Sequence, residues 1–209
     1  LVAELVAERI PQKFSFQPES EIQVLTPMHK GEVGTVALNQ RLQARLNPDL
    51  KETVRPSKPA PDEGERMRFR VGDKVLQTKN DYEKGVFNGD VGKVVRLDSE
   101  SAGLVVEFEH ESGLRQVEYK KSEVLQLTLA YAMTIHKSQG SEYPAVVLAL
   151  LPAHFVMLSR NLIYTAVTRA KKLCVVVGDG RAFDLALAET RKEQRCTWLA
   201  QRIRRACAS

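Results

Sequence analysis

Two apolar runs separated by a helix-like segment place the strongest limit on the fold. The runs read AVVLAL, at residues 145–150, and LCVVVG, at residues 173–178. The segment between them, RNLIYTAVTRAKK, has apolar residues at helical spacing, and a further helix-like segment, RAFDLALAE, follows. Strands apolar on both faces that alternate with helices are typical of a parallel sheet covered by helices. The pattern predicts an α/β fold class.

The same unit occurs earlier in the chain. The segment EIQVLTPMHKG contains an apolar run that Pro27 ends, and the helix-like GTVALNQRLQARLN follows and stops at Asn47-Pro48. A helix is also predicted for LAYAMTIHKS, residues 129–138, ahead of AVVLAL. The opening LVAELVAERIPQKF predicts an amphipathic helix that packs on something upstream, so we expect residues 1–20 to continue a longer parent chain.

A segment with a different period of apolar residues separates the two α/β stretches. From residue 66 to 125, short alternating segments are divided by turn signals such as Asn88-Gly89 and Ser112-Gly113, which predicts a small antiparallel barrel of SH3 size. The Pro-rich stretch before it has a linker composition. The predicted organisation is as follows: N-terminal helix 1–20, α/β domain 21–55 and 126–190, linker 56–65, barrel 66–125, basic terminal helix or tail 191–209.

Composition narrows the possible partners and compartment. With 209 residues, 43% of them hydrophobic, the chain can bury a sizeable core, and its net charge of +5 is compatible with a polyanionic partner. No apolar run reaches the roughly 18 residues of a membrane span, and no signal segment opens the chain. We therefore expect a cytoplasmic protein with no membrane partner. Cys174, Cys196 and Cys207 have no CxxC spacing, which predicts neither disulfides nor a metal site.

A complete phosphate-binding loop is missing from the sequence. NGDVGKV, residues 88–94, places Gly-Lys in a loop, but a Walker A loop needs GxxxxGK[ST] between a strand and a helix, and this one lies between two β segments. A hairpin turn is the better interpretation. We expect the chain alone not to hydrolyse ATP.

Polar residues follow two of the predicted elements. Thr26, His29 and Lys30 come just after the carboxyl end of a strand, where open α/β sheets bind ligands, although an ordinary turn has the same composition. Thr134 to Gln139 place polar donors before Gly140, which lets a backbone approach a ligand closely, and Glu142 follows. A solvated helix end capped by Gly140 is the alternative.

Arg169 follows Thr165 by four residues on the predicted helix. A guanidinium held by a helix has the fixed donors that an arginine finger directs at a transferring phosphoryl group. The alternative is an ordinary surface arginine beside Lys171 and Lys172.

Three segments, in this order, resemble a known family. VLTPMHKGEVGTVALNQRLQ, AYAMTIHKSQGSEYPAVVL and RNLIYTAVTRAKKLCVVVG are similar to motifs IV, V and VI of the RecD-like helicases, in the 5′-to-3′ branch of superfamily 1. The barrel resembles the SH3-like domain 2B that these enzymes insert into their second RecA-like domain, 2A. The resemblance implies a RecA-like parallel sheet of the P-loop NTPase helicase type, interrupted by a small all-β SH3-like barrel.

The resemblance also implies roles for individual residues. Arg169 would be the catalytic finger to the γ-phosphate of ATP, and Gly140 and Glu142 would face the nucleotide. Residues implied to bind single-stranded DNA on the RecA-like domain are Thr26, Pro27, His29, Thr134, His136 and Lys137. Barrel candidates for DNA contact are Asn80, Tyr82 and Asn88.

ATP and Mg²⁺ are the implied cofactors, with the Mg²⁺ ligands on a first RecA-like domain of the same parent chain. The implied substrates are single-stranded DNA and single-strand/duplex junctions, in DNA repair or recombination. One alternative is a non-catalytic module, derived from a helicase, that binds single-stranded DNA or a protein. Another is a relaxase-linked or RNA-directed helicase of the same superfamily.

Overall fold

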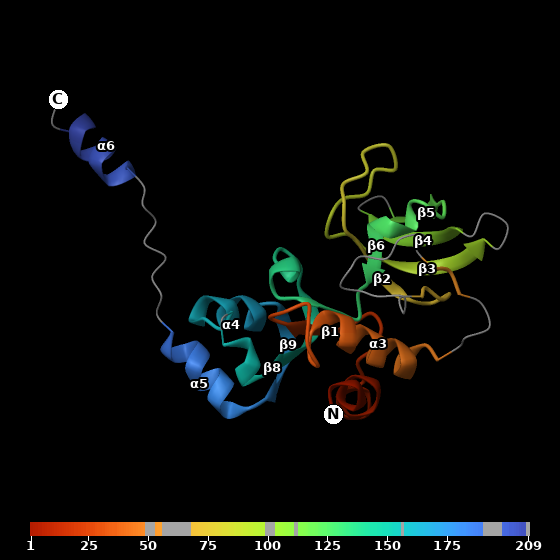
Figure 1. Cartoon of the computed structure of the whole chain (residues 1–209), viewed down its shortest axis with the longest axis horizontal. Helices are drawn as coiled ribbons and strands as arrows, with labels where there is room; N and C mark the ends of the chain where they lie inside the picture. The colour runs from red at the N-terminus through yellow and green to blue at the C-terminus, as the bar shows by residue number, and fades with distance from the viewer. Residues whose placement is uncertain are drawn as a thin grey trace.

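The described residues form one parallel and one antiparallel sheet (Figure 1). The computed structural model describes the following residues: 1–48, 53–55, 68–98, 103–110, 113–155, 157–189 and 198–207. The predicted linker at 56–65, Ser112 of the second predicted turn, and residues 191–197 lie outside these ranges. The predicted α/β class with an all-β insert is confirmed.

The parallel sheet is built from segments on both sides of the insert. Its strands are β1 (Ile22–Thr26), β7 (Ala132–Thr134), β8 (Tyr143–Leu150) and β9 (Ala170–Gly178), in the order β7-β1-β8-β9. Because β1 pairs in parallel with both β7 and β8, the chain leaves this sheet after β1 and returns to it at β7. The antiparallel part therefore interrupts the parallel one.

Helices cover both faces of the parallel sheet. The helical elements before the insert are α1 Val2–Glu4, the π-helix η1 Leu5–Arg9, α2 Ile10–Phe14 and α3 Thr35–Leu46. Those after it are the 3₁₀ turn η5 Pro152–His154, α4 Arg160–Val167, α5 Gly180–Ala188 and, near the carboxyl end of the chain, α6 Leu199–Ala206. Along β8, Val147 belongs to the core cluster that includes Leu38 of α3, whereas Val146 belongs to the cluster that includes Leu162 of α4. Side chains that alternate between two apolar layers explain the continuous apolar run. None of the helices in the described ranges has the length and hydrophobicity that a membrane crossing requires.

The predicted helix over residues 129–138 is wrong. These residues form the end of β6 (Leu127–Leu129), then β7, and the 3₁₀ turn η4 (His136–Ser138). Ala132 and Met133 lie in register with Val24 and Leu25 of β1. Pairing with a strand more than 100 residues away in the sequence therefore overrides the local preference of Leu, Ala and Met for helix.

The helix that carries the Arg169 segment is also shorter than predicted. Ser159 caps the start of α4, since its Oγ accepts from the backbone N–H of Leu162 at 3.2 Å. The helix ends at Val167, and Lys171 and Lys172 belong to β9. Arg169 therefore lies just beyond the helix rather than on it.

The antiparallel sheet is called here the β insert. Its strands are β2 (Lys74–Gln77), β3 (Val91–Asp98), β4 (Gly103–His110), β5 (Gly113–Tyr119) and β6, in the order β5-β4-β3-β2-β6. The 3₁₀ turn η3 (Val124–Gln126) precedes β6, which pairs with β2 and lies beyond the predicted end of the barrel at residue 125.

Asn88-Gly89 does form a turn, since the backbone N–H of Asp90 donates to the carbonyl of Phe87 at 3.0 Å. The turn does not join two strands as a two-residue hairpin, however. It lies within the longer connection from β2 to β3, residues 78–90.

Asp73 fixes the β insert to α3. Its buried carboxylate accepts from Gln43 Nε2 at 2.6 Å and Asn47 Nδ2 at 2.8 Å. The Tyr131 hydroxyl and the Arg70 backbone N–H donate to it at 3.0 and 2.8 Å. Burial raises the pKa of Asp73, and these four hydrogen bonds act in the opposite direction.

Lys74 makes a second buried contact between the two parts. Its ammonium donates to Gln23 Oε1 of β1 at 2.9 Å and lies 5.7 Å from the centre of the Tyr143 ring of β8. Burial lowers the pKa of Lys74 to about 8. Together with Asp73, Lys74 ties the start of β2 to the parallel sheet.

Candidate nucleotide and nucleic-acid site

Two threonines shape the carboxyl edge of the parallel sheet. Thr26 and Thr134 lie side by side at the ends of β1 and β7. Thr26 is completely buried, and its hydroxyl donates to the carbonyl of Val33 at 2.6 Å. Thr134 is 6% exposed, and its Oγ1 accepts from the backbone N–H of Lys137 at 3.3 Å. Both hydroxyls therefore hold the loops that follow their strands.

The more exposed side chains at this edge come from the same loops. His29 and His136 are exposed and Lys137 is partly exposed, whereas Pro27 is buried. His29 Nδ1 lies 2.9 Å from the hydroxyl of Thr35, the first residue of α3. The structure thus brings the six predicted residues of this domain to one edge, and it exposes the two imidazoles most.

A crossover, residues 135–142, leads from this edge to the start of β8. The Ser138 hydroxyl donates to the carbonyl of Ile135 at 2.8 Å, which closes the η4 turn. Gly140 has φ +88°, and no atom lies within 4 Å of the position that a Cβ would take. A left-handed residue with open space above it allows a ligand to approach the backbone.

Glu142, at the end of this crossover, pairs with β9. Its Oε2 lies 3.3 Å from the ammonium of Lys171, and both side chains are about half exposed. An exposed pair of this kind contributes little to stability, so Glu142 can exchange Lys171 for another partner at small cost.

The Arg169 side chain is held by three acceptors. Its Nε donates to the carbonyl of Thr165 at 3.2 Å, Nη1 to the carbonyl of Ser141 at 2.9 Å, and Nη2 to the hydroxyl of Thr168 at 3.2 Å. The Tyr143 backbone N–H donates to the Arg169 carbonyl at 2.8 Å. Arg169 therefore lies directly against the loop of Gly140 and Glu142, the two other residues that the resemblance implies at the nucleotide.

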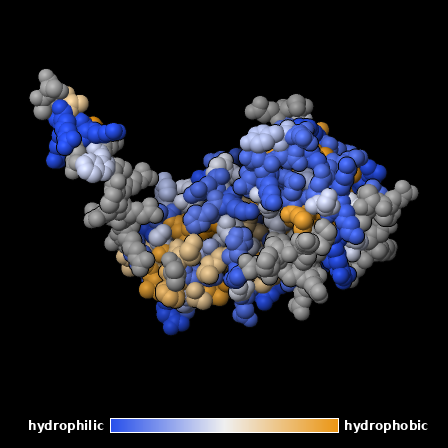
Figure 2. Space-filling view, turned by 45° about the horizontal axis from the view of Figure 1, so that its top comes forward, coloured by the Kyte–Doolittle hydropathy of each residue, from blue (hydrophilic) through white to orange (hydrophobic). Residues whose placement is uncertain are grey.

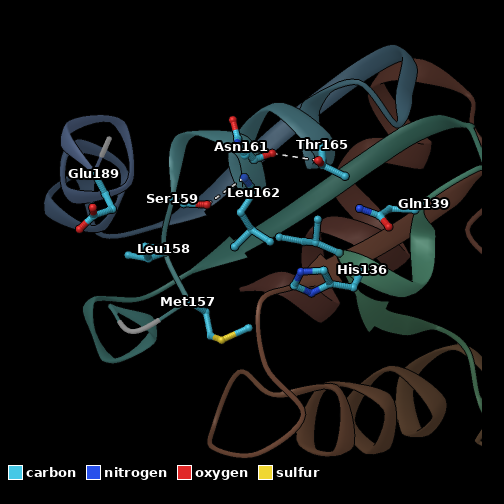
Figure 3. Close-up of a pocket in the computed structure, with 10 residues that line it drawn as sticks. His136, Gln139, Met157, Leu158, Ser159, Asn161, Leu162, Thr165 and Glu189 are labelled. Atoms are coloured by element: carbon cyan, nitrogen blue, oxygen red, sulfur yellow. Dashed lines mark hydrogen bonds between the residues drawn. The ribbon is translucent and has the colours of Figure 1, made fainter. Parts of the chain in front are cut away.

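A pocket of about 400 Å³ opens between the crossover and α4 (Figure 3). His136 and Gln139 line it from the crossover, and Asn161 and Thr165 line it from α4. Thr165 donates through its hydroxyl to the Asn161 carbonyl at 2.8 Å. The pocket thus has polar groups on both sides and ends one helical turn before Arg169.

The residues predicted to bind DNA and those predicted to face the nucleotide lie at opposite ends of the parallel sheet. Ala145 of β8 pairs with Ile22 of β1, which is four residues before Thr26. Tyr143 is the start of β8, two residues before Ala145. At about 3.3 Å per strand residue, the carboxyl edge and the start of β8 are roughly 20 Å apart. Residues 135–142 are the direct chain connection between them.

The β insert brings its three predicted residues into one loop. Asn80 Oδ1 accepts from the backbone N–H of Asn88 at 2.9 Å, and Asn80 Nδ2 donates to the Tyr82 hydroxyl at 3.4 Å. Reciprocal backbone hydrogen bonds between Asp81 and Val86, at 2.8 and 3.0 Å, close the loop. Asn80 therefore acts mainly as an organiser of this loop.

An aromatic pair lies on the surface of the same loop. Tyr82 is 78% exposed and Phe87 is 42% exposed, and their rings meet edge to face with centroids 5.9 Å apart. Phe87 was not among the predicted residues, although an aromatic residue directly before an Asn-Gly turn is a signal that the sequence contains. Thr168 was not among them either, and no sequence pattern indicates its contact with Arg169.

No group of three or more His, Cys, Asp or Glu side chains in the described part of the chain is arranged to hold a metal ion. The groups around Gly140 are instead a guanidinium and an open stretch of backbone. This donor set fits phosphate oxygens.

Comparisons with known proteins agree with this architecture. Residues 38–108 match the ATP-dependent RecD-like DNA helicase SH3 domain, and residues 129–177 match the UvrD-like helicase C-terminal domain. The ATP-dependent RecD2 DNA helicase of Deinococcus radiodurans is 45% identical over 183 residues, which cover 88% of this chain and 23% of that protein. The RecBCD enzyme subunit RecD of Mycobacterium tuberculosis is 32% identical, over 88% of this chain and 29% of that subunit. The chain thus spans less than a third of either relative.

Solved helicase structures share the fold. The Pif1 helicase from Bacteroides in complex with ADP-AlF3 and ssDNA aligns with a TM-score of 0.58 at 21% identity, over 99% of this chain and 49% of that one. Bacteroides Pif1 bound to ssDNA gives 0.53 at 19% identity, over 98% of this chain and 49% of that one. One chain thus carries matches to both the UvrD-like helicase C-terminal domain and the RecD-like DNA helicase SH3 domain, on a parallel sheet with an SH3-like insert of the kind found in the solved helicases.

Proposed function

We propose that this chain is the second motor half of an ATP-dependent, 5′-to-3′ DNA helicase that translocates on single-stranded DNA. It works with a first RecA-like domain that supplies the Walker motifs and the Mg²⁺ ligands. The relatives named ATP-dependent RecD2 DNA helicase and RecBCD enzyme subunit RecD support this proposal. The sequence itself lacks GxxxxGK[ST], so ATP turnover needs the other half.

The observation that carries the proposal is the placement of Arg169. Its guanidinium is fixed by Thr165 and Thr168 and directed at the loop of Gly140 through the carbonyl of Ser141. A phosphate held over this loop takes the place of that carbonyl as acceptor. Arg169 then stabilises the charge that develops on the transferring phosphoryl group.

The single-stranded DNA is held at the carboxyl edge of the parallel sheet. His29, His136 and Lys137 contact the phosphodiester backbone, while the buried hydroxyls of Thr26 and Thr134 keep their loops in position. Backbone contacts imply binding that is independent of base sequence and weakened by salt. The 135–142 crossover then couples the binding of DNA to the binding and hydrolysis of ATP, because one of its ends lies at the DNA site and the other at the nucleotide site.

Steady-state ATPase kinetics of the complete helicase test this assignment. We expect Arg169→Ala to lower DNA-stimulated kcat by about 10³ to 10⁵ while nucleotide binding is retained, because a finger acts mainly on the transition state. Arg160→Ala is the matched control: it removes the same charge at the other end of α4, where the guanidinium donates to the Leu187 carbonyl at 3.1 Å. Weaker nucleotide binding with unchanged turnover would refute the finger role.

A second candidate is a non-catalytic module that binds single-stranded DNA through the β insert. The exposed Tyr82 and Phe87 pair favours it, since aromatic side chains stack on bases without an ATPase cycle. The sequence joined to the amino end of this chain distinguishes the two: a GxxxxGK[ST] loop there supports the motor, and its absence supports the module.

A further inference from the structure

The helix α6 carries an aromatic and basic stripe outside the segments that resemble helicase motifs. Trp198 lies at its N-cap and is 71% exposed. The Arg202 backbone N–H donates to the Trp198 carbonyl at 2.9 Å, so Trp198 and Arg202 lie one helical turn apart. Arg202 and Arg205 are exposed, and Figure 2 shows strongly hydrophilic residues gathered over α6.

Helical geometry places these side chains on one face. At 3.6 residues per turn, Arg202 is rotated about 40° from Trp198 in one sense and Arg205 about 20° in the other. Arg204 is rotated about 120° from Trp198 and lies off this face. Trp198, Arg202 and Arg205 are named here the α6 stripe.

The chemistry of the α6 stripe selects among anionic partners. A guanidinium binds phosphate oxygens with two parallel hydrogen bonds, and an exposed indole stacks on an unpaired base. Acidic proteins have no base for the indole, and duplex DNA keeps its bases stacked internally. Membrane-surface helices place aromatic residues opposite their basic face, whereas Trp198 shares the face of Arg202. Single-stranded nucleic acid is the partner that uses both features.

We propose that the α6 stripe is an additional binding surface for single-stranded DNA, separate from the carboxyl edge of the parallel sheet and from the β insert. The proposal rests on the proposed function for the identity of the polymer. Trp198 is the single tryptophan of the chain, so its fluorescence reports on this surface alone.

The test is a titration of the 209-residue chain with an end-labelled oligothymidylate, in which Trp198 fluorescence and label anisotropy are read together. We expect quenching of Trp198 that saturates with the anisotropy. Arg202→Ala with Arg205→Ala should weaken binding about tenfold and reduce the quenching, since charge-assisted contacts to phosphate are lost. Arg204→Ala, with one charge removed from the same helix, should change affinity less than twofold.

Several outcomes would overturn the proposal. A rise in anisotropy without a change in Trp198 fluorescence excludes the α6 stripe and leaves the proposed function standing, whereas no response in either signal counts against both. An effect of Arg204→Ala as large as that of the double variant indicates unspecific charge attraction. Stronger quenching by duplex DNA, by polyglutamate or by phosphatidylserine vesicles assigns the stripe to another partner.

Discussion

The Arg169 guanidinium donates through Nη1 to the carbonyl oxygen of Ser141 at 2.9 Å, across 28 residues of sequence. This contact joins the end of α4 to the loop of Gly140 and Glu142. A phosphate bound over the loop competes for that donor, while Nε and Nη2 keep their own acceptors at Thr165 and Thr168. In the proposed function, these two acceptors align the side chain before a nucleotide binds, which reduces the entropic cost of ordering it.

Thr168 is expected to position Arg169. Its hydroxyl accepts from Nη2 at 3.2 Å and donates to the Thr165 carbonyl at 3.0 Å. In the complete helicase, Thr168→Val should lower the kcat of DNA-stimulated ATP hydrolysis by about fivefold, because one hydrogen bond of about 1 kcal/mol that orients the guanidinium is lost. Thr168→Ser keeps the hydroxyl and should restore most of the rate. A Thr168→Val enzyme with normal kcat and an altered KM would contradict this role.

The aromatic pair of the β insert should affect unwinding more than ATP hydrolysis. Tyr82→Ala with Phe87→Ala removes stacking contacts worth about 1–3 kcal/mol per base. Duplex unwinding by the complete helicase should therefore fall, with a larger loss at higher salt, while ATPase activity at saturating single-stranded DNA changes little.

Leu114→Ala is the control for this pair, because Leu114 is 71% exposed on β5 of the same insert. Adding Asn80→Ala and Asn88→Ala to Tyr82→Ala should reproduce the loss, because Asn80 organises the loop. Equal losses of unwinding and ATPase activity would place the insert in the ATPase cycle, and no loss would make it a structural element.

Lys74 should make stability rise with pH. Its pKa in the folded chain is about 8, below the ordinary 10.5, so the unfolded chain binds more protons between these values. From pH 7 to pH 9 the cost of the buried charge should decrease by about 1 kcal/mol. Denaturant titrations of wild type and Lys74→Met at several pH values measure this dependence. From pH 7 to pH 9, the free energy of unfolding of the wild type should rise relative to that of the variant. A difference that stays constant over this range would show that Lys74 is not buried as a charge.

Asp73 should be the stronger of the two connections between the sheets. Asp73→Ala leaves four donors without their acceptor, from Gln43, Asn47, Tyr131 and the Arg70 backbone, and should cost on the order of 3 kcal/mol in the free energy of unfolding. Tyr131→Phe removes a single donor and should cost about 1 kcal/mol. Chemical denaturation followed by circular dichroism compares the two, and a similar cost for both variants would rule out the carboxylate as the central acceptor.

Local sequence determined the elements whose neighbours are near in the chain. The apolar runs became β8 and β9, because alternate side chains such as Val146 and Val147 meet helices on both faces. Ser159 and Asp179 cap α4 and α5 with their own side chains, a signal that a sequence contains. The three helicase-like segments also indicated that Gly140, Glu142 and Arg169 belong together.

Only the tertiary structure decided the state of residues 129–134, which are rich in helix formers. Asn39 donates to the carbonyls of Leu129 and Ala132, at 3.0 and 2.8 Å, and accepts from the Ala132 backbone N–H at 2.7 Å. Gln23 donates to the carbonyl of Ala130 at 3.1 Å, from 107 residues away. These side chains and β1 satisfy the backbone groups that a helix would have paired internally. Because a buried backbone takes the conformation that satisfies its hydrogen bonds, distant partners made this segment a strand.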